Sequence, residues 1–89
     1  MKLTQTVKVK NSLGLHIRPA TAIVKLLQNT SSKVFFSFKD MTVNAKSIMS
    51  LLILSAQKNA TIEITIEGKD ASLVMEQLSE GFETKFGER

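Results

Sequence analysis

The chain has 89 residues, no cysteine and a formal net charge of +4. This length allows one domain with a buried core, which we expect to span residues 1–89, but it is too short for an enclosed active-site cleft. The lack of cysteine excludes disulfides, thiolate chemistry and cysteine zinc sites. The first six residues lack the apolar core of a signal peptide, and the apolar-rich run at 48–54 is far shorter than a membrane span. We therefore expect a cytoplasmic protein without membrane insertion.

The first third of the chain predicts a strand, a loop and a helix. Apolar and polar residues alternate from Leu3 to Val9, which is the pattern of a half-buried strand. Residues 11–14 break that pattern as a loop. Apolar side chains at positions 20, 23, 24 and 27 then form one helical stripe. Proline is favoured in a first helical turn, so Pro19 indicates that this helix begins near His16, and residues 29–32 should end it.

The rest of the chain predicts three more strands and two more helices. Alternation over residues 34–38 indicates a second strand, which a tight turn at Lys39-Asp40 links to a short third strand at 41–43. Ser47 is expected to cap a short helix that runs to about Leu54. Residues 61–67 alternate cleanly as a fourth strand, and Gly68 turns the chain. Asp70 should then cap a last helix, whose apolar face comprises Ala71, Val74, Met75, Leu78 and Phe82.

The predicted element order is βαββαβα. Helices with one apolar stripe and strands with one apolar face favour an α+β fold with two layers. We expect an open-faced sandwich, in which three helices cover one face of an antiparallel four-stranded sheet. The other face, which carries threonine, glutamate and lysine, should face water.

The single histidine lies where the first loop turns into the first helix, in the run Gly14-Leu15-His16-Ile17-Arg18-Pro19. The first amides of a helix have no partners within it, so they form a positively polarised anion site. Arg18 adds a planar cation suited to phosphate oxygens, and Pro19 fixes the first turn. A neutral imidazole can attack phosphorus near pH 7. No carboxylate lies in the same loop, which suggests attack by the imidazole itself. His16 is therefore a candidate phosphohistidine.

By composition alone, a lone histidine at a helix start is more often a cap or a solvated surface residue. The surrounding Gly-Leu-His-x-Arg-Pro sequence favours the phosphoryl chemistry.

A second candidate site begins at Ser47, the expected helix cap. The helix that follows carries too many apolar residues for one buried face: Ile48, Met49, Leu51, Leu52, Ile53 and Leu54. Either it is buried all round or part of it is exposed for docking, and we favour the docking surface. Methionine suits adaptable contacts with several partners.

The run Gly14 to Ala20, the run Val43 to Met49, and Gly68-x-Asp70 together resemble the HPr family. This is the histidine phosphocarrier family of the bacterial phosphoenolpyruvate-dependent sugar phosphotransferase system. The resemblance extends from the first strand to the last helix. It implies that enzyme I phosphorylates His16 at Nδ1, with Arg18 assisting, and that the phosphate passes to IIA domains of sugar transporters. The partner-contacting positions that it implies are Ile17, Arg18, Thr21, Ile48, Met49 and Leu52.

In many bacteria, a kinase phosphorylates the family serine that corresponds to Ser47, so the resemblance implies an HPr kinase/phosphorylase as a further partner. A phosphate there would be tolerated by the helix dipole and would place about two negative charges on the docking surface. The chain departs from the family pattern at three places, one of which is Lys58-Asn59-Ala60, where the glycine common before the last strand is missing. Ile17 replaces the small or hydroxylated residue that usually follows the histidine, and Ser50 stands where many relatives have glycine.

Two other functions stay open: a related carrier in a regulatory, nitrogen-related phosphotransferase branch, and a small α+β binding module with a solvated His16. A nucleic-acid partner is not expected, because the basic residues are scattered and lack interleaved exposed aromatics. One histidine without cysteine gives no recognisable metal-ligand set. We expect a monomer without cofactor or metal that relays a phosphoryl group and is not a turnover enzyme.

Overall fold

The computed structural model describes residues 1–88, which contain the seven predicted strands and helices in the predicted order. These are β1 (Lys2–Lys8), α1 (Ile17–Leu27), β2 (Lys33–Phe38), β3 (Met41–Asn44), α2 (Ile48–Ile53), β4 (Thr61–Glu67) and α3 (Ala71–Glu83). A short 3-10 turn, η1 (Lys85–Gly87), follows α3. This turn was not among the elements predicted from the sequence. None of the helices in the described part of the chain is long and apolar enough to cross a lipid bilayer.

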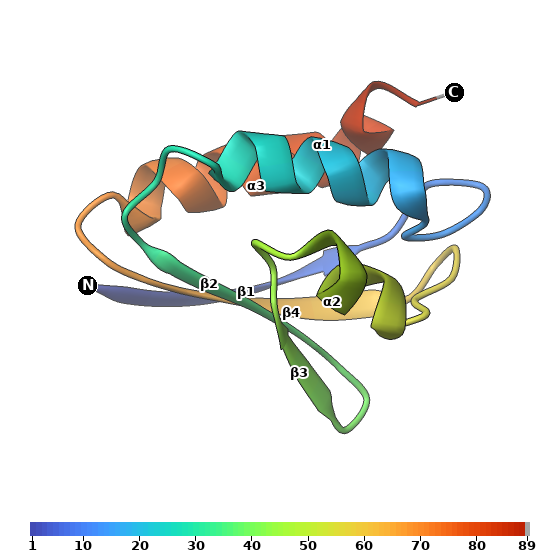
Figure 1. The fold of residues 1–89 in the computed structure, drawn as a ribbon, viewed down its shortest axis with the longest axis horizontal. Helices are drawn as coiled ribbons and strands as arrows, with labels where there is room; N and C mark the ends of the chain where they lie inside the picture. Colours follow the sequence, from blue (N-terminus) through green and yellow to red (C-terminus); the bar gives the residue numbers. More distant parts are fainter. Residues whose placement is uncertain (89) are drawn as a thin grey trace.

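The four strands form one antiparallel sheet in the order β1-β4-β2-β3. The register sets Ile66 of β4 between Leu3 of β1 and Val34 of β2, so apolar side chains from three strands meet in one row. The helices lie on one side of this sheet (Figure 1). The predicted open-faced sandwich is therefore confirmed.

The core lies between the sheet and the helices. All five residues of the predicted apolar face of α3 are buried, and α1 buries Ala20, Ile23 and Leu27. The fully buried strand residues Ile62, Ile64, Ile66 and Phe36 face them from the sheet. The ring of Phe36 lies 5.8 Å from that of Phe82 in α3. The 3.6-residue and two-residue periodicities of the sequence therefore indicated the two halves of this core correctly.

Asp70 occupies the predicted N-cap position of α3, but its side chain makes no capping hydrogen bond. Its carboxylate instead accepts hydrogen bonds from the hydroxyls of Thr30 and Ser32, in the segment that leads into β2. These two bonds, that from Ser32 first, hold the pKa of Asp70 below its ordinary value of 3.8. The prediction that the Asp70 side chain caps α3 was wrong, because both carboxylate oxygens accept hydrogen bonds from hydroxyls of another segment.

The turn η1 folds the end of the chain back over α3. Lys85, Phe86 and Gly87 all have positive φ, at 59°, 51° and 80°. The Phe86 ring packs edge-on against Phe82, with their centroids 5.0 Å apart. A side chain at position 81 would collide with that ring, which explains why glycine occupies this position in α3. Aromatic packing therefore anchors a backbone conformation that lysine and phenylalanine rarely adopt.

Candidate functional site

His16 occupies the N-cap position of α1, as the sequence predicted. Its backbone is extended (φ −94°, ψ −166°), and its carbonyl accepts the first intrahelical hydrogen bond, from the amide of Ala20 at 3.0 Å. Its side chain makes no capping bond, so the imidazole is free for other contacts. The backbone at the start of α1 therefore fixes the position of the His16 side chain, while neither ring nitrogen is engaged in capping the helix.

The loop before His16 is held against the segment that precedes β4. The amide of Leu15 donates to the carbonyl of Ala56 at 2.8 Å, and the Leu15 side chain is buried. Gly14 has φ +74°, and a Cβ at this position would lie 2.5 Å from the same carbonyl oxygen. Only glycine allows this left-handed turn and this close approach, so it determines the path of the chain into His16.

A carboxylate from the end of the chain reaches the imidazole. Oε2 of Glu88 lies 2.7 Å from Nε2 of His16, and their side chains are 13% and 26% exposed. This is ion-pair distance, but the approach lacks the alignment of a hydrogen bond, and Nε2 is buried with no such bond among the described residues. The sequence has no carboxylate in the His16 loop, and a carboxylate from the C-terminal segment was not predicted at this site.

Asn11 holds Glu88 in this place. Its side-chain nitrogen donates to Oε1 of Glu88 at 2.7 Å and to the carbonyl of Lys85 at 2.9 Å. Asn11 is almost completely buried. Its hydrogen bond, then the charge of the nearby His16, holds the pKa of Glu88 below its ordinary value, while partial burial opposes the shift. Glu88 is therefore an ionised hydrogen-bond acceptor at neutral pH.

The other predicted residues of this site, Arg18 and Pro19, lie in the first turn of α1. Pro19 is buried in the first turn, and Arg18 is exposed beside it. The positive charge of Arg18 also contributes to the lowered pKa of Glu88. No acidic residue lies in the first turn of α1, so its unpaired amides face an incoming anion without repulsion from their own helix.

Ser47 is the N-cap of α2, as predicted. Its hydroxyl oxygen accepts a hydrogen bond from the amide of Ser50 at 3.2 Å. Its backbone is extended, with φ −120° and ψ 120°. Next to it, the Lys46 ammonium donates to the carbonyl of Thr30 at 3.1 Å, which links the start of α2 to the segment between α1 and β2. Ser47 as a whole is half-buried.

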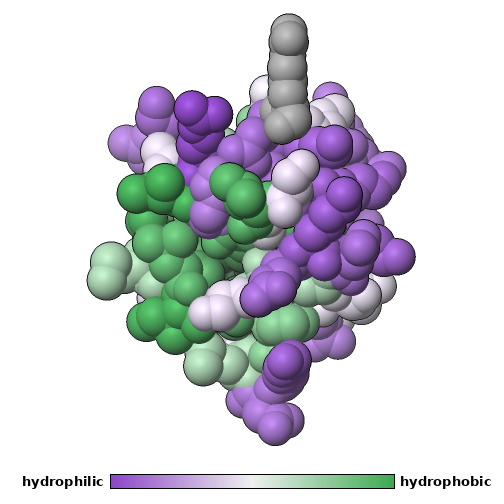
Figure 2. All heavy atoms as spheres, turned by 90° about the vertical axis from the view of Figure 1, so that its right-hand side faces the viewer, coloured by the Kyte–Doolittle hydropathy of each residue, from purple (hydrophilic) through white to green (hydrophobic). Residues whose placement is uncertain are grey.

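Hydrophobic side chains gather on one part of the molecular face in Figure 2, beside a hydrophilic region. The exposed fractions are 60% for Ile17, 68% for Met49 and 56% for Ile53. Ile48 and Leu52 are half-buried against the core, and Leu51 is fully buried. We call Ile17, Ile48, Met49, Leu52 and Ile53 the α1–α2 patch. Ile53 was one of the apolar residues of the expected docking helix, but it was not among the predicted partner-contacting positions.

Thr21, another predicted contact residue, is half-buried one turn into α1, where its hydroxyl donates to the carbonyl of Ile17 at 2.7 Å.

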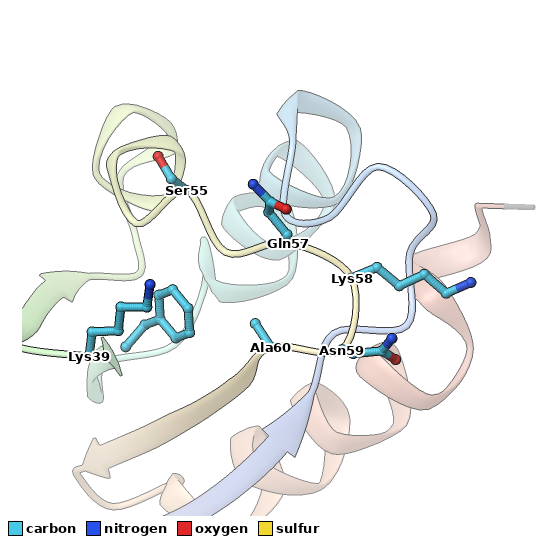
Figure 3. A pocket seen from close by; sticks show the side chains of 7 residues that line it. Lys39, Ser55, Gln57, Lys58, Asn59 and Ala60 are labelled. Carbon is cyan, nitrogen blue, oxygen red and sulfur yellow. The ribbon is translucent and has the colours of Figure 1, made fainter.

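A shallow cavity of about 400 Å³ lies between the β2–β3 turn and the loop before β4 (Figure 3). It contains none of the predicted site residues; its lining comprises Phe38, Lys39, Ser55, Gln57, Lys58, Asn59 and Ala60. The Lys39 ammonium lies 5.3 Å from the centre of the Phe38 ring. This cavity is separate from the His16 site.

Comparison with known proteins identifies the family. The family sequence model described as the PTS HPr component phosphorylation site matches residues 3–84. The chain belongs to the HPr family. The phosphocarrier protein HPr of Chlamydia trachomatis is 41% identical over 87 residues, which cover 98% of this chain and 80% of that one. This chain is therefore a phosphocarrier of the phosphotransferase system and not a turnover enzyme.

Solved structures agree with this assignment. HPr from Thermoanaerobacter tengcongensis has a TM-score of 0.92 and 33% identity, with 98% of each chain covered. Crh of Bacillus subtilis, whose structure is described as a domain-swapped dimer, has a TM-score of 0.75 and 31% identity, with 91% of this chain and 93% of that one covered.

Proposed function

We propose that His16 accepts a phosphoryl group from enzyme I at Nδ1 and passes it to IIA domains of sugar transporters. The observation that carries this proposal is the state of the imidazole. Nε2 is buried beneath Glu88, yet the side chain is 26% exposed, so the accessible part of the ring lies elsewhere. Nδ1 is then the ring nitrogen that remains for attack on phosphorus.

Groups at the start of α1 would bind the transferred phosphate. The unpaired amides of the first turn donate to its oxygens, and the Arg18 guanidinium offers a charged fork. Pro19 fixes the turn that presents these groups. This stabilisation is moderate, because it uses helix amides and one exposed arginine. A phosphate held moderately can both form and leave, which a carrier requires.

The α1–α2 patch is the proposed docking surface for these partners. Its apolar residues lie at the start of α1 and along α2, and the flexible side chain of Met49 can adapt to different protein surfaces. The relay would take place in the cytoplasm, with the chain acting as a monomer and residues 1–89 as one carrier domain.

Ser47 is the proposed regulatory site, phosphorylated by an HPr kinase/phosphorylase. Ser47 is half-buried, and its hydroxyl caps α2 beside the patch. A phosphate on it would be stabilised by the amides of α2 and would add about two negative charges next to the docking surface. Partners that dock through apolar contacts would then bind more weakly.

A reconstituted relay tests this function. We expect phosphate from phosphoenolpyruvate to reach a IIA domain only when enzyme I and this chain are both present. Met49→Glu should slow the relay about tenfold or more, because a charge would be desolvated at the docking surface. Leu73→Glu is the matched control: Leu73 is 56% exposed on α3, outside the patch, and its variant should behave as wild type. Equal rates for both variants would contradict docking through the patch.

A further inference from the structure

The contact between Glu88 and His16 determines which ring nitrogen carries the proton. An ionised carboxylate can only accept hydrogen bonds. Were Nε2 to present its lone pair, two electron-rich atoms would face each other at 2.7 Å in a buried place. The neutral imidazole avoids this repulsion by keeping its proton on Nε2. Nδ1 then carries the lone pair.

Two independent anchors hold Glu88 at this position. Asn11 binds both Oε1 of Glu88 and the carbonyl of Lys85, so it holds the side chain and the turn that carries it. Phe86 packs on Phe82 and occupies the space left by Gly81, which holds the turn to α3. Lys85 and Phe86 adopt positive φ within this turn. Such backbone conformations persist only where the surrounding structure enforces them, so Glu88 is held in place.

We propose that Glu88 is a positioning residue for phosphoryl transfer: it keeps the His16 proton on Nε2 and so presents the Nδ1 lone pair to the phosphoryl donor. This inference rests on the proposed function of His16. It assigns a role to a carboxylate that touches neither the donor nor the transferred phosphate. Asn11 supports the same arrangement because its side-chain nitrogen donates a hydrogen bond to Oε1, the carboxylate oxygen of Glu88 that does not face His16.

Phosphoryl transfer would use the lone pair on Nδ1 and leave the proton on Nε2 in place. The Nδ1 lone pair forms a bond to phosphorus while the bond between phosphorus and the donor breaks, and that electron pair stays with the donor. The proton on Nε2 does not move, so the phosphorylated ring becomes an imidazolium. Its positive charge develops directly opposite Glu88. A carboxylate that orients an imidazole through one nitrogen and stabilises the resulting cation is a known arrangement in histidine-dependent catalysis.

The geometry of Asn11 gives a sharp test with Glu88→Gln. Asn11 donates toward the Oε1 position, so the new amide oxygen should remain there. The amide nitrogen would then occupy the Oε2 position and donate to Nε2 of His16. The ring would have to carry its proton on Nδ1, which removes the nucleophilic lone pair. Glu88→Ala merely removes the contact, so it should impair phosphorylation less than Glu88→Gln.

The measurement is the ring ¹⁵N chemical shifts of unphosphorylated protein, at a pH where the imidazole is neutral. We expect the proton on Nε2 in wild type, mainly on Nδ1 in Glu88→Gln, and in a mixture in Glu88→Ala. Glu83→Gln is the control, because Glu83 pairs with Lys10 at the surface and its loss causes the same change of charge. Phosphorylation by enzyme I should slow about a hundredfold in Glu88→Gln and stay unchanged in Glu83→Gln.

An Nε2–H tautomer that persists unchanged in Glu88→Gln would overturn the inference. So would phosphorylation of that variant at the wild-type rate. Because the tautomer is read without any phosphoryl donor, this result is independent of the proposed function. A wild-type chain that has the expected tautomer but accepts no phosphate would refute the function and leave the assignment of the proton intact.

Discussion

Asp70 illustrates how individual residues link distant segments of this chain. Its carboxylate accepts hydrogen bonds from Thr30 and Ser32, which ties the start of α3 to the start of β2. These bonds stabilise the charged form, so the pKa of Asp70 is lower in the folded state than its ordinary value of 3.8. A carboxylate with a depressed pKa stabilises the fold at neutral pH and loses that contribution in acid.

Asp70→Asn should therefore be less stable than wild type at pH 7. The stability difference should be complete above about pH 5 and should shrink as the pH falls through the folded-state pKa, below 3.8. Denaturant unfolding of both proteins at several pH values measures it. Glu88 also has a lowered pKa, but it is present in both proteins, so its contribution cancels in the comparison. A stability difference that is constant down to the lowest pH would contradict this account.

The helix α2 shows how one short element can serve both the fold and the proposed docking surface. It buries Leu51 while exposing Met49 and Ile53, and the Ser47 hydroxyl satisfies the amide of Ser50 at its start. A helix of six residues has little stability of its own, so its cap and its packing maintain it. A charge added at Ser47 would therefore lie next to Ile48 and Met49, at one edge of the proposed docking surface.

Two substitutions separate the structural role of Ser47 from its proposed regulatory role. Ser47→Ala removes the cap and should cost about 1 kcal/mol of stability, yet it should leave phosphorylation by enzyme I close to wild type. Ser47→Asp keeps a good cap and adds a negative charge, so it should be as stable as wild type but accept phosphate more slowly. Thermal unfolding and the initial rate of phosphorylation measure the two effects. Fast phosphorylation of Ser47→Asp would argue against charge-based regulation.

At the scale of the whole molecule, the sequence predicted the layers because periodicity is a local signal. The five buried positions of α3 and the alternation of β4 follow directly from it. The capping role of Ser47 was also readable, since serine before an apolar run is a local pattern. His16 was placed correctly at the start of α1, because Gly14 and Pro19 flank the loop-to-helix transition.

The surroundings of His16 could not be predicted in the same way. Asn11 and Glu88 are 77 positions apart, and neither carries a local signal for the other. The turn that brings Glu88 back has positive φ at Lys85 and Phe86, residue types that do not favour it. The turn forms because the Phe86 ring packs against Phe82 in the space left by Gly81. This is tertiary packing, which the local sequence does not indicate. The histidine was thus predictable from sequence, whereas the carboxylate beside it required the fold.

The most direct test of the central claim is to locate the phosphate. Wild type and His16→Ala would be incubated with enzyme I, magnesium and phosphoenolpyruvate, and the products analysed by intact mass and by ¹H–³¹P and ¹⁵N NMR. We predict the gain of one acid-labile phosphoryl group on wild type, bonded to Nδ1 of His16, and none on His16→Ala. Equal phosphorylation of both proteins, or none on wild type while a known HPr is phosphorylated normally, would contradict the account.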